Sequence, residues 1–158
     1  MPALPSLSSL LAPDRVRVGL EAADKDGVVG EMAALVASAP GVRDAERLAA
    51  DVRAREAQMS TGVGEGVALP HARTPAVDRT AAAFATLARP VDYAAFDGKP
   101  VRLVLLLAGP ESERPAHVRL LGRVSRLLAD ADLRARLLAA RTPHAVLGEI
   151  ERAESLLI

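Results

Sequence analysis

The residues best suited to chemistry lie in one short segment, from Arg55 to His71. The segment contains three alternating glycines, a brief apolar strand and a proline, and it ends on a histidine: Gly62, Gly64, Gly66, Val67–Leu69, Pro70 and His71. Glycine allows close approach to the backbone because no Cβ stands in the way. An imidazole is nucleophilic and titrates near neutral pH. The segment therefore predicts chemistry at a ring nitrogen of His71.

The chain contains two further histidines, His117 and His144. His117 lies near the first turn of a predicted long helix, where free amide groups and the positive helix end favour an anion. His144 lies in the first turn of the last predicted helix and is interpreted as a surface residue. His71 and His117 also fit the simpler interpretation of ordinary loop or first-turn residues. A zinc site would need all three in a dispersed arrangement, since no His-x-x-x-His or His-Glu pair occurs.

The glycines by themselves leave other interpretations open. Gly62 to Gly66 begin like a dinucleotide-binding fingerprint, but Val67 stands in place of the third glycine and a strand follows instead of a helix. A phosphate-binding P-loop needs Gly-Lys-Ser or Gly-Lys-Thr after its glycines, and neither occurs. A tight bend between a helix and a strand also fits. His71 immediately after the bend favours a functional role.

Composition excludes several classes of protein. The 158 residues include 20 basic and 20 acidic side chains, and this balance argues against a nucleic-acid-binding surface. Aromatic residues are only 2% of the chain, which argues against base stacking. No cysteine is present, so disulfides and thiolate metal sites are excluded. We expect one globular domain over residues 1–158, with its core at about 15–150.

We also expect a cytoplasmic protein that does not insert into a membrane. The start of the chain, Met1–Pro5, lacks the basic region and sustained apolar run of a signal peptide. The longest strongly apolar run, Leu103–Ala108, is too short to cross a bilayer. We recognise no second domain and no membrane span that would belong to a transporter.

Periodicity predicts alternating helices and strands, and therefore an α/β architecture. Strands are expected at 16–20, 67–69, 81–87 and 101–108, and the last is so aliphatic that it should be central. The turn-rich segment 89–100 is expected to hold a short edge strand. Helices are expected after Asp24, at about 44–58, 116–130 and 132–140, and from Thr142 onwards. The inward stripe of the helix at 116–130 is predicted to be Val118, Leu121, Val124, Leu127 and Leu128.

The run from Arg55 to His71 resembles the active-site signature of type-2 enzyme IIA domains of the bacterial phosphotransferase system, the fructose, mannitol and nitrogen-regulatory class. The resemblance covers about residues 15–150 and includes four downstream blocks: Arg89–Tyr93, Asp97–Val101, Leu105–Pro110 and Leu127–Asp130. His117 stands where the family carries a second histidine. The resemblance implies a single-domain fold with a mixed, about five-stranded sheet flanked by helices on both sides.

By this resemblance, His71 is the phosphorylated nucleophile, which accepts a phosphoryl group from the phosphocarrier protein HPr and passes it to an enzyme IIB. His117 would orient the phosphoryl group by a hydrogen bond. Arg55 would neutralise phosphoryl oxygens, and Ser60 or Thr61 would donate a hydroxyl hydrogen bond. No cofactor and no metal are implied.

The chemistry is consistent with these assignments. A neutral imidazole has a free lone pair, and the protein need only position groups and supply donors to the spreading charge. The second ring nitrogen of His71 must be held by an acceptor to fix its tautomer, and the sequence does not identify that acceptor.

Two positions depart from the family pattern. Glu65 stands where many members have asparagine, and a carboxylate beside a phosphoryl group repels it unless the side chain points to solvent. Arg73 stands where several members have lysine, which keeps the charge.

Two alternatives remain for the function. The first is a stand-alone regulatory (nitrogen-type) enzyme IIA whose phosphorylation state controls protein partners. The second and weaker is a metal-dependent hydrolase that uses the three histidines. The pattern of an edge strand and apolar helical stripes is compatible with a monomer and with a homodimer.

Overall fold

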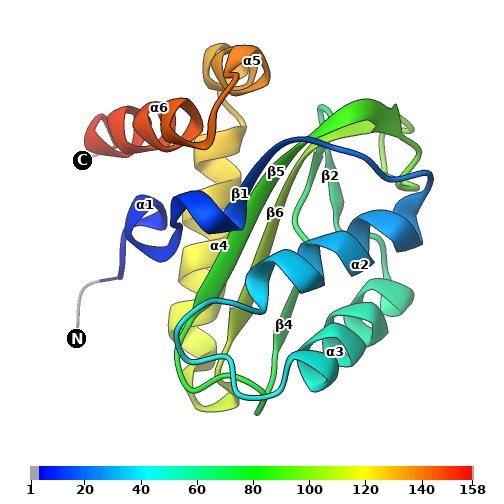
Figure 1. The fold of residues 1–158 in the computed structure, drawn as a ribbon, viewed down its shortest axis with the longest axis vertical. Coiled ribbons are helices and arrows are strands. Elements are labelled where there is room, and N and C mark those ends of the chain that lie inside the picture. The colour runs from blue at the N-terminus through cyan, green and yellow to red at the C-terminus, as the bar shows by residue number, and fades with distance from the viewer. Residues whose placement is uncertain (1–3, 158) are drawn as a thin grey trace.

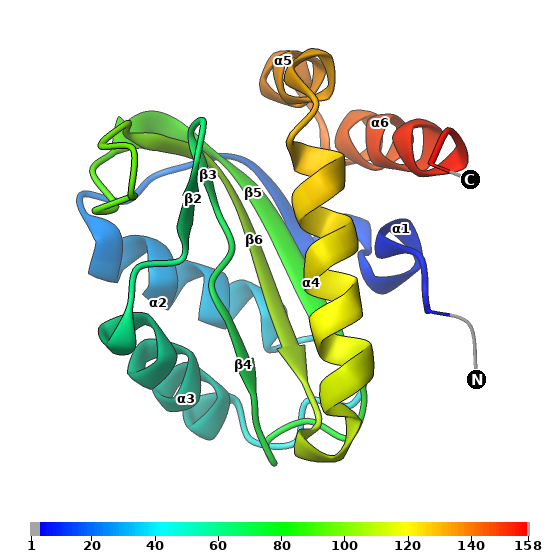
Figure 2. The same cartoon turned by 180° about the vertical axis from the view of Figure 1, so that it is seen from behind.

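Helices pack on both faces of one mixed β-sheet in the computed structural model, which describes residues 4–157 (Figures 1 and 2). The helical elements are α1 (Leu7–Leu10), η1 (Pro13–Arg15), α2 (Lys25–Val36), α3 (Ala45–Gln58), η2 (Glu111–Glu113), α4 (Arg114–Leu128), α5 (Ala131–Ala139) and α6 (Pro143–Ser155). The strands are β1 (Val16–Leu20), β2 (Gly62–Gly64), β3 (Val67–Ala68), β4 (His71–Arg73), β5 (Ala81–Val91) and β6 (Val101–Gly109).

The sheet has the strand order β1-β5-β6-β3-β2, and β4 also pairs with β6. The long strands β5 and β6 are antiparallel, whereas β3 and β4 run parallel to β6. The sheet has six strands where about five were expected. The prediction of an α/β fold with a mixed sheet flanked by helices on both sides is confirmed.

The two faces of the sheet form two separate hydrophobic clusters. Helices α2 and α3 cover one face, and α1, α4, α5 and α6 cover the other (Figures 1 and 2). Residues alternate along β6 between the two clusters, so that Leu106 faces α2 while Leu105 and Leu107 face α4. The aliphatic composition of β6 therefore follows from its burial on both sides.

The strands β3 and β4 form one extended segment parallel to β6, which is interrupted at Leu69 and Pro70. Both halves keep the same register beside β6, because Ala68 pairs with Val104 and His71 pairs with Leu107. Pro70 has no N–H to donate, but its carbonyl still accepts from the Leu107 amide at 3.0 Å. The sequence predicted His71 just past a strand, whereas the structure places it at the first position of β4.

The glycine segment is a β-hairpin and not only a bend. Strands β2 and β3 pair antiparallel, and the connection uses positive φ at Gly64 (95°), Glu65 (56°) and Gly66 (80°). At Gly62 an added Cβ would lie 2.9 Å from the Cα of Ala95. The hairpin therefore packs directly against the backbone of the loop that joins β5 to β6. The hairpin thereby fixes where the chain enters His71.

Three local predictions were wrong. The segment 92–100 forms a loop and not an edge strand, because β5 continues to Val91 and Tyr93 is fully buried below the loop. On α4, Leu120 is buried instead of Val118, which is 57% exposed. Leu121 is only partly buried.

None of the helices within residues 4–157 has the length and apolar composition that a membrane span requires.

Candidate functional site

The ring of His71 is half-buried at the start of β4 and points to the α4 face of the sheet. Its Nδ1 lies 2.7 Å from the carbonyl oxygen of Leu69. A carbonyl only accepts hydrogen bonds, so Nδ1 carries the proton and Nε2 keeps a free lone pair. Leu69 is therefore the acceptor that the sequence left unidentified.

His117 lies in the second turn of α4 and is only 6% exposed. Its ring centroid is 5.8 Å from that of His71, with 48° between the ring planes. Among the described residues, neither ring nitrogen of His117 has a hydrogen-bond partner. The ring packs against Gly109, where an added Cβ would lie 2.8 Å from Nδ1. The structure thus brings together the two histidines that the sequence singled out, and β6 leaves room for the second.

A pocket of about 500 Å³ contains both histidines. Its lining residues come mainly from α3, β4 and the start of α4, and Figure 2 shows β4 between these two helices. Its lining is Arg47, Asp51, Ala54, Arg55, Gln58, His71, Ala72, Arg73, Glu111, Arg114, His117, Val118 and Leu121. The pocket is open to solvent, and His71 is its half-buried histidine, whereas His117 is buried behind it.

The lining of this pocket is basic. Arg47 is neutralised by Asp51 at 2.9 Å, and Asp51 also accepts from Thr74 at 2.6 Å. By contrast, Arg55, Arg73 and Arg114 have no ion-pair partner within the described part of the chain. These three guanidinium groups favour an anion in the pocket, and each can bind two oxygens at once.

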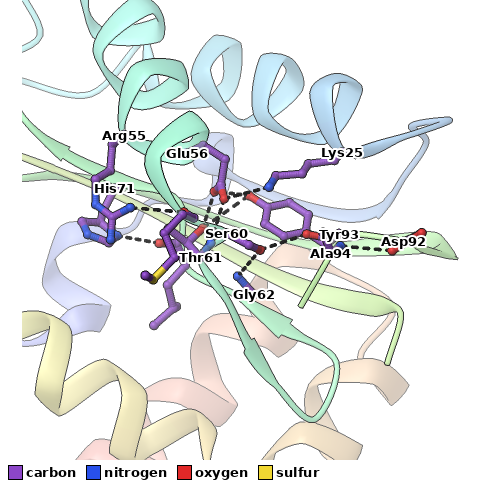
Figure 3. Close-up of polar contacts among 12 residues, drawn as sticks. Lys25, Arg55, Glu56, Ser60, Thr61, Gly62, His71, Asp92, Tyr93 and Ala94 are labelled. Carbon is purple, nitrogen blue, oxygen red and sulfur yellow. Dashed lines mark hydrogen bonds and ion pairs between the residues drawn. The ribbon is translucent and has the colours of Figure 1, made fainter. Parts of the chain in front are cut away.

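Arg55 comes from the last turn of α3 and is held in place by the backbone. Its Nη1 donates to the carbonyl oxygen of Met59 at 3.2 Å, which leaves its other N–H groups available (Figure 3). Arg73 is placed by β4 and donates to the carbonyl of Glu111 at 3.5 Å. Arg55 lines the same pocket as His71, and its role in neutralising phosphoryl oxygens stays a prediction.

The hydroxyl groups of Ser60 and Thr61 do not line the pocket. Ser60 donates to the carbonyl of Tyr93 at 2.9 Å, and Thr61 donates to the carboxylate of Glu56. Both hydroxyls are engaged in fastening the hairpin to its surroundings. Their direct contact with a phosphoryl group stays a prediction.

Sequence reasoning missed Glu56, which is 6% exposed next to the site. Its carboxylate accepts from the Thr61 amide at 2.7 Å and from the Tyr93 hydroxyl at 2.8 Å, and it pairs with Lys25 at 3.1 Å (Figure 3). The available signal was its place beside Arg55 in the signature, but two of its partners, Lys25 and Tyr93, lie far away in sequence.

Glu65 lies outside the pocket and points to solvent. It forms an ion pair with Lys99 at 3.1 Å and has an exposed side chain. The concern about a carboxylate beside the reacting group therefore does not apply. Among residues 4–157 no three side chains of His, Asp or Glu converge as a metal site requires, so the three histidines do not form the dispersed zinc site.

Burial keeps both histidines of the pocket uncharged. Burial lowers the pKa of His71 below its ordinary value of 6.5, and the Leu69 hydrogen bond opposes this only partly. Burial lowers the pKa of His117 to about 4, with the charges of His71 and Arg73 acting in the same direction. At neutral pH the site therefore presents two neutral imidazoles inside a positively charged rim.

Comparison with known proteins gives a consistent result. Residues 9–153 match the family model described as "Phosphoenolpyruvate-dependent sugar phosphotransferase system, EIIA 2". The chain is 37% identical over 141 residues to a nitrogen regulatory protein of Bradyrhizobium diazoefficiens, which covers 89% of this chain and 91% of that protein. It is 34% identical over 146 residues to the fructose-specific EIIABC component of Bacillus subtilis, covering 92% of this chain but only 23% of that protein. Among solved structures, nitrogen regulatory protein IIA-Ntr from Neisseria meningitidis superposes with a TM-score of 0.83 at 26% identity, covering 91% and 98% of the two chains.

The lowered pKa of His117 predicts a defined pH dependence of stability. Between about pH 6.5 and 4 the unfolded chain binds a proton that the folded protein does not, so the free energy of unfolding falls as the pH falls. The slope is at most about 1.4 kcal/mol per pH unit for this one group. Urea unfolding at several pH values measures it, with His117→Gln as the comparison. An equal slope in both proteins over that window would contradict the assignment to His117.

Proposed function

The chain belongs to the EIIA type-2 family of the phosphoenolpyruvate-dependent sugar phosphotransferase system, and within that family we propose that it is a histidine phosphocarrier. His71 accepts a phosphoryl group from an HPr-type phosphocarrier protein and passes it to an enzyme IIB. The observation that carries this proposal is the 2.7 Å contact between Nδ1 of His71 and the Leu69 carbonyl, which leaves Nε2 free inside an arginine-lined pocket.

The proposed step forms one bond and breaks one. The lone pair on Nε2 of neutral His71 attacks phosphorus, and the bond from phosphorus to the donor's imidazole nitrogen breaks with its electron pair returning to the donor ring. No proton has to leave His71, since Nδ1–H stays bonded to Leu69. The phosphorylated ring carries a formal positive charge, which the Leu69 carbonyl dipole stabilises. In transfer to enzyme IIB, a nucleophile of that protein attacks phosphorus, and the bond from phosphorus to Nε2 breaks with its electron pair returning to the His71 ring.

The other pocket residues stabilise the transferred group. Charge spreads over its three outer oxygens in the transition state, so donors in fixed positions lower the barrier. Arg55 from α3 and Arg73 from β4 supply guanidinium N–H groups in the pocket that contains His71. Neutral His117 has an unpartnered ring N–H for one more hydrogen bond. Ser60 and Thr61 support these donors by holding the hairpin.

The remaining assignments follow from the same proposal. The protein partners are an HPr-type phosphocarrier and an enzyme IIB, and no nucleic acid or cofactor takes part. Residues 1–158 act as one domain, in the cytoplasm where the phosphocarriers are. The exposed apolar side chain of Val118 at the rim of the pocket suits a protein partner.

Labelling with phosphoenolpyruvate tests the nucleophile. With enzyme I, HPr and labelled phosphoenolpyruvate, we expect stoichiometric label on the wild-type protein and none on His71→Ala. His144→Ala is the matched control, because His144 is exposed on α6, and it should be labelled like the wild type. Label on His71→Ala at the wild-type level would exclude this phosphocarrier role.

The role of His117 gives a second prediction. His117→Ala should lower the rate of label transfer to His71 about 100-fold, the effect of losing one donor to the transition state. Rapid-quench measurement of the transfer rate tests this, and urea unfolding shows whether the variant still unfolds cooperatively. A variant that loses cooperative unfolding would assign His117 to the structure instead of to transfer.

A second candidate function is regulatory. The relative from Bradyrhizobium diazoefficiens, whose length is matched almost completely, bears the name nitrogen regulatory protein. The fructose-specific relative is much longer than this chain. On this alternative the phosphorylation state of His71 controls binding to other proteins, and onward transfer of the group is not the purpose.

Discharge of the phosphorylated protein separates the two candidates. A phosphocarrier for sugar uptake should lose its label within seconds on addition of the fructose- or mannitol-class enzyme IIB of the same organism. The measurement is label on each protein after electrophoresis. Stable label on His71 in the presence of every such enzyme IIB would favour the regulatory function.

A further inference from the structure

The buried carboxylate of Glu56 holds together four parts of the chain, of which only the end of α3 and the hairpin are close in sequence. It accepts from the amide and the hydroxyl of Thr61, from the hydroxyl of Tyr93, and from the ammonium group of Lys25 (Figure 3). Lys25 also lies 5.0 Å from the centre of the Tyr93 ring. Helix α2, the end of α3, the hairpin and the loop after β5 therefore meet at one group.

A chain of hydrogen bonds leads from this carboxylate to the reacting ring. Glu56 fixes Thr61 at the entry to β2, and the carbonyl of Thr61 accepts from the Leu69 amide at 2.9 Å. The carbonyl of the same Leu69 accepts from Nδ1 of His71. The position of the His71 acceptor therefore depends on Thr61, and the position of Thr61 depends on Glu56.

We propose that Glu56 is a positioning residue for phosphoryl transfer, which fixes the Nδ1–H tautomer of His71 through Thr61 and Leu69. It does not touch the transferred group, because its side chain lies outside the pocket that contains both histidines. This inference rests on the proposed phosphocarrier function, since it explains which nitrogen of His71 is presented to phosphorus.

The carboxylate is needed in its charged form. Two oxygens offer about four lone-pair positions, and all of the donors from Thr61, Tyr93 and Lys25 use them. Burial acts to raise the pKa of Glu56, but the hydrogen bonds from Thr61, Tyr93 and Lys25 lower it below its ordinary value. A glutamine here has one acceptor oxygen and no charge, so at least one donor loses its partner while the side-chain shape is kept.

Glu56→Gln tests the inference through the ring of His71 itself. Nitrogen-15 NMR of the unphosphorylated protein should show the two ring nitrogens shifting from a single tautomer towards averaged values. The His71 pKa should fall further, because both the Leu69 hydrogen bond and the Glu56 charge raise it in the wild type. The rate of transfer from HPr should fall roughly 10- to 100-fold, as expected for a small displacement of the reacting group.

Glu46→Gln is the matched control, because Glu46 is an exposed carboxylate in the first turn of the same helix. It should leave the tautomer, the His71 pKa and the transfer rate unchanged. A folded Glu56→Gln protein that keeps a single Nδ1–H tautomer and transfers within twofold of the wild-type rate would overturn the inference.

A second variant covers the case in which Glu56→Gln does not fold. Tyr93→Phe removes one donor to the carboxylate and should shift the tautomer in the same direction by a smaller amount, whereas no shift would overturn the inference. The NMR measurement needs no HPr, so it separates this inference from the proposed function. Failure of labelling at His71 removes the function, and an unchanged tautomer in a labelled protein removes only the role of Glu56.

Discussion

The hydrogen bond from Nδ1 of His71 to the carbonyl of Leu69 is the interaction on which the site depends. It exists because of the register beside β6. In that ladder the carbonyls of Gly66 and Pro70 accept from β6. Leu69 has the opposite parity, so its carbonyl faces away from β6 and can bond to a side chain of its own strand. The register of this segment beside β6 therefore decides which nitrogen of the His71 imidazole is free.

Most of the fold could be predicted because its signals are local. The strand at Val16–Leu20 was placed correctly, and Thr142 caps its helix as expected. The helices predicted to start at Asp24 and about Asp44 begin directly after these residues, whose side chains accept from backbone amides. The hairpin at Gly62–Ala68 was not recognised, because glycines permit both a bend and a turn of positive φ. The burial of Tyr93 was also missed, since a turn-rich composition does not show which loop residue folds inward.

The candidate site was predictable where function depends on spacing along the chain, and not where it depends on distant contacts. The signature from Arg55 to His71 brings its two ends to one pocket, together with His117. The hydroxyl of Thr61 fits phosphate binding in the sequence, and the structure shows it donating to the carboxylate of Glu56. Nothing in the sequence places Tyr93, 37 positions from Glu56, beside that carboxylate. The sequence therefore could not predict which hydroxyl groups donate to the carboxylate of Glu56, because one of these donors comes from a distant part of the chain.

The interruption at Leu69 and Pro70 has a consequence for how other proteins can approach. Beyond it, the single strand that pairs with β4 among residues 4–157 is β6, and α3 lies alongside β4. A continuous unpaired strand edge would allow a strand of another protein to extend the sheet, and the added backbone would then cover His71. Here β4 is short, follows Pro70 and is covered by α3, so its edge does not offer a partner strand a continuous row of backbone groups to pair with. A protein partner must therefore contact the imidazole through its side chains. It can then dissociate without breaking a row of backbone hydrogen bonds between strands.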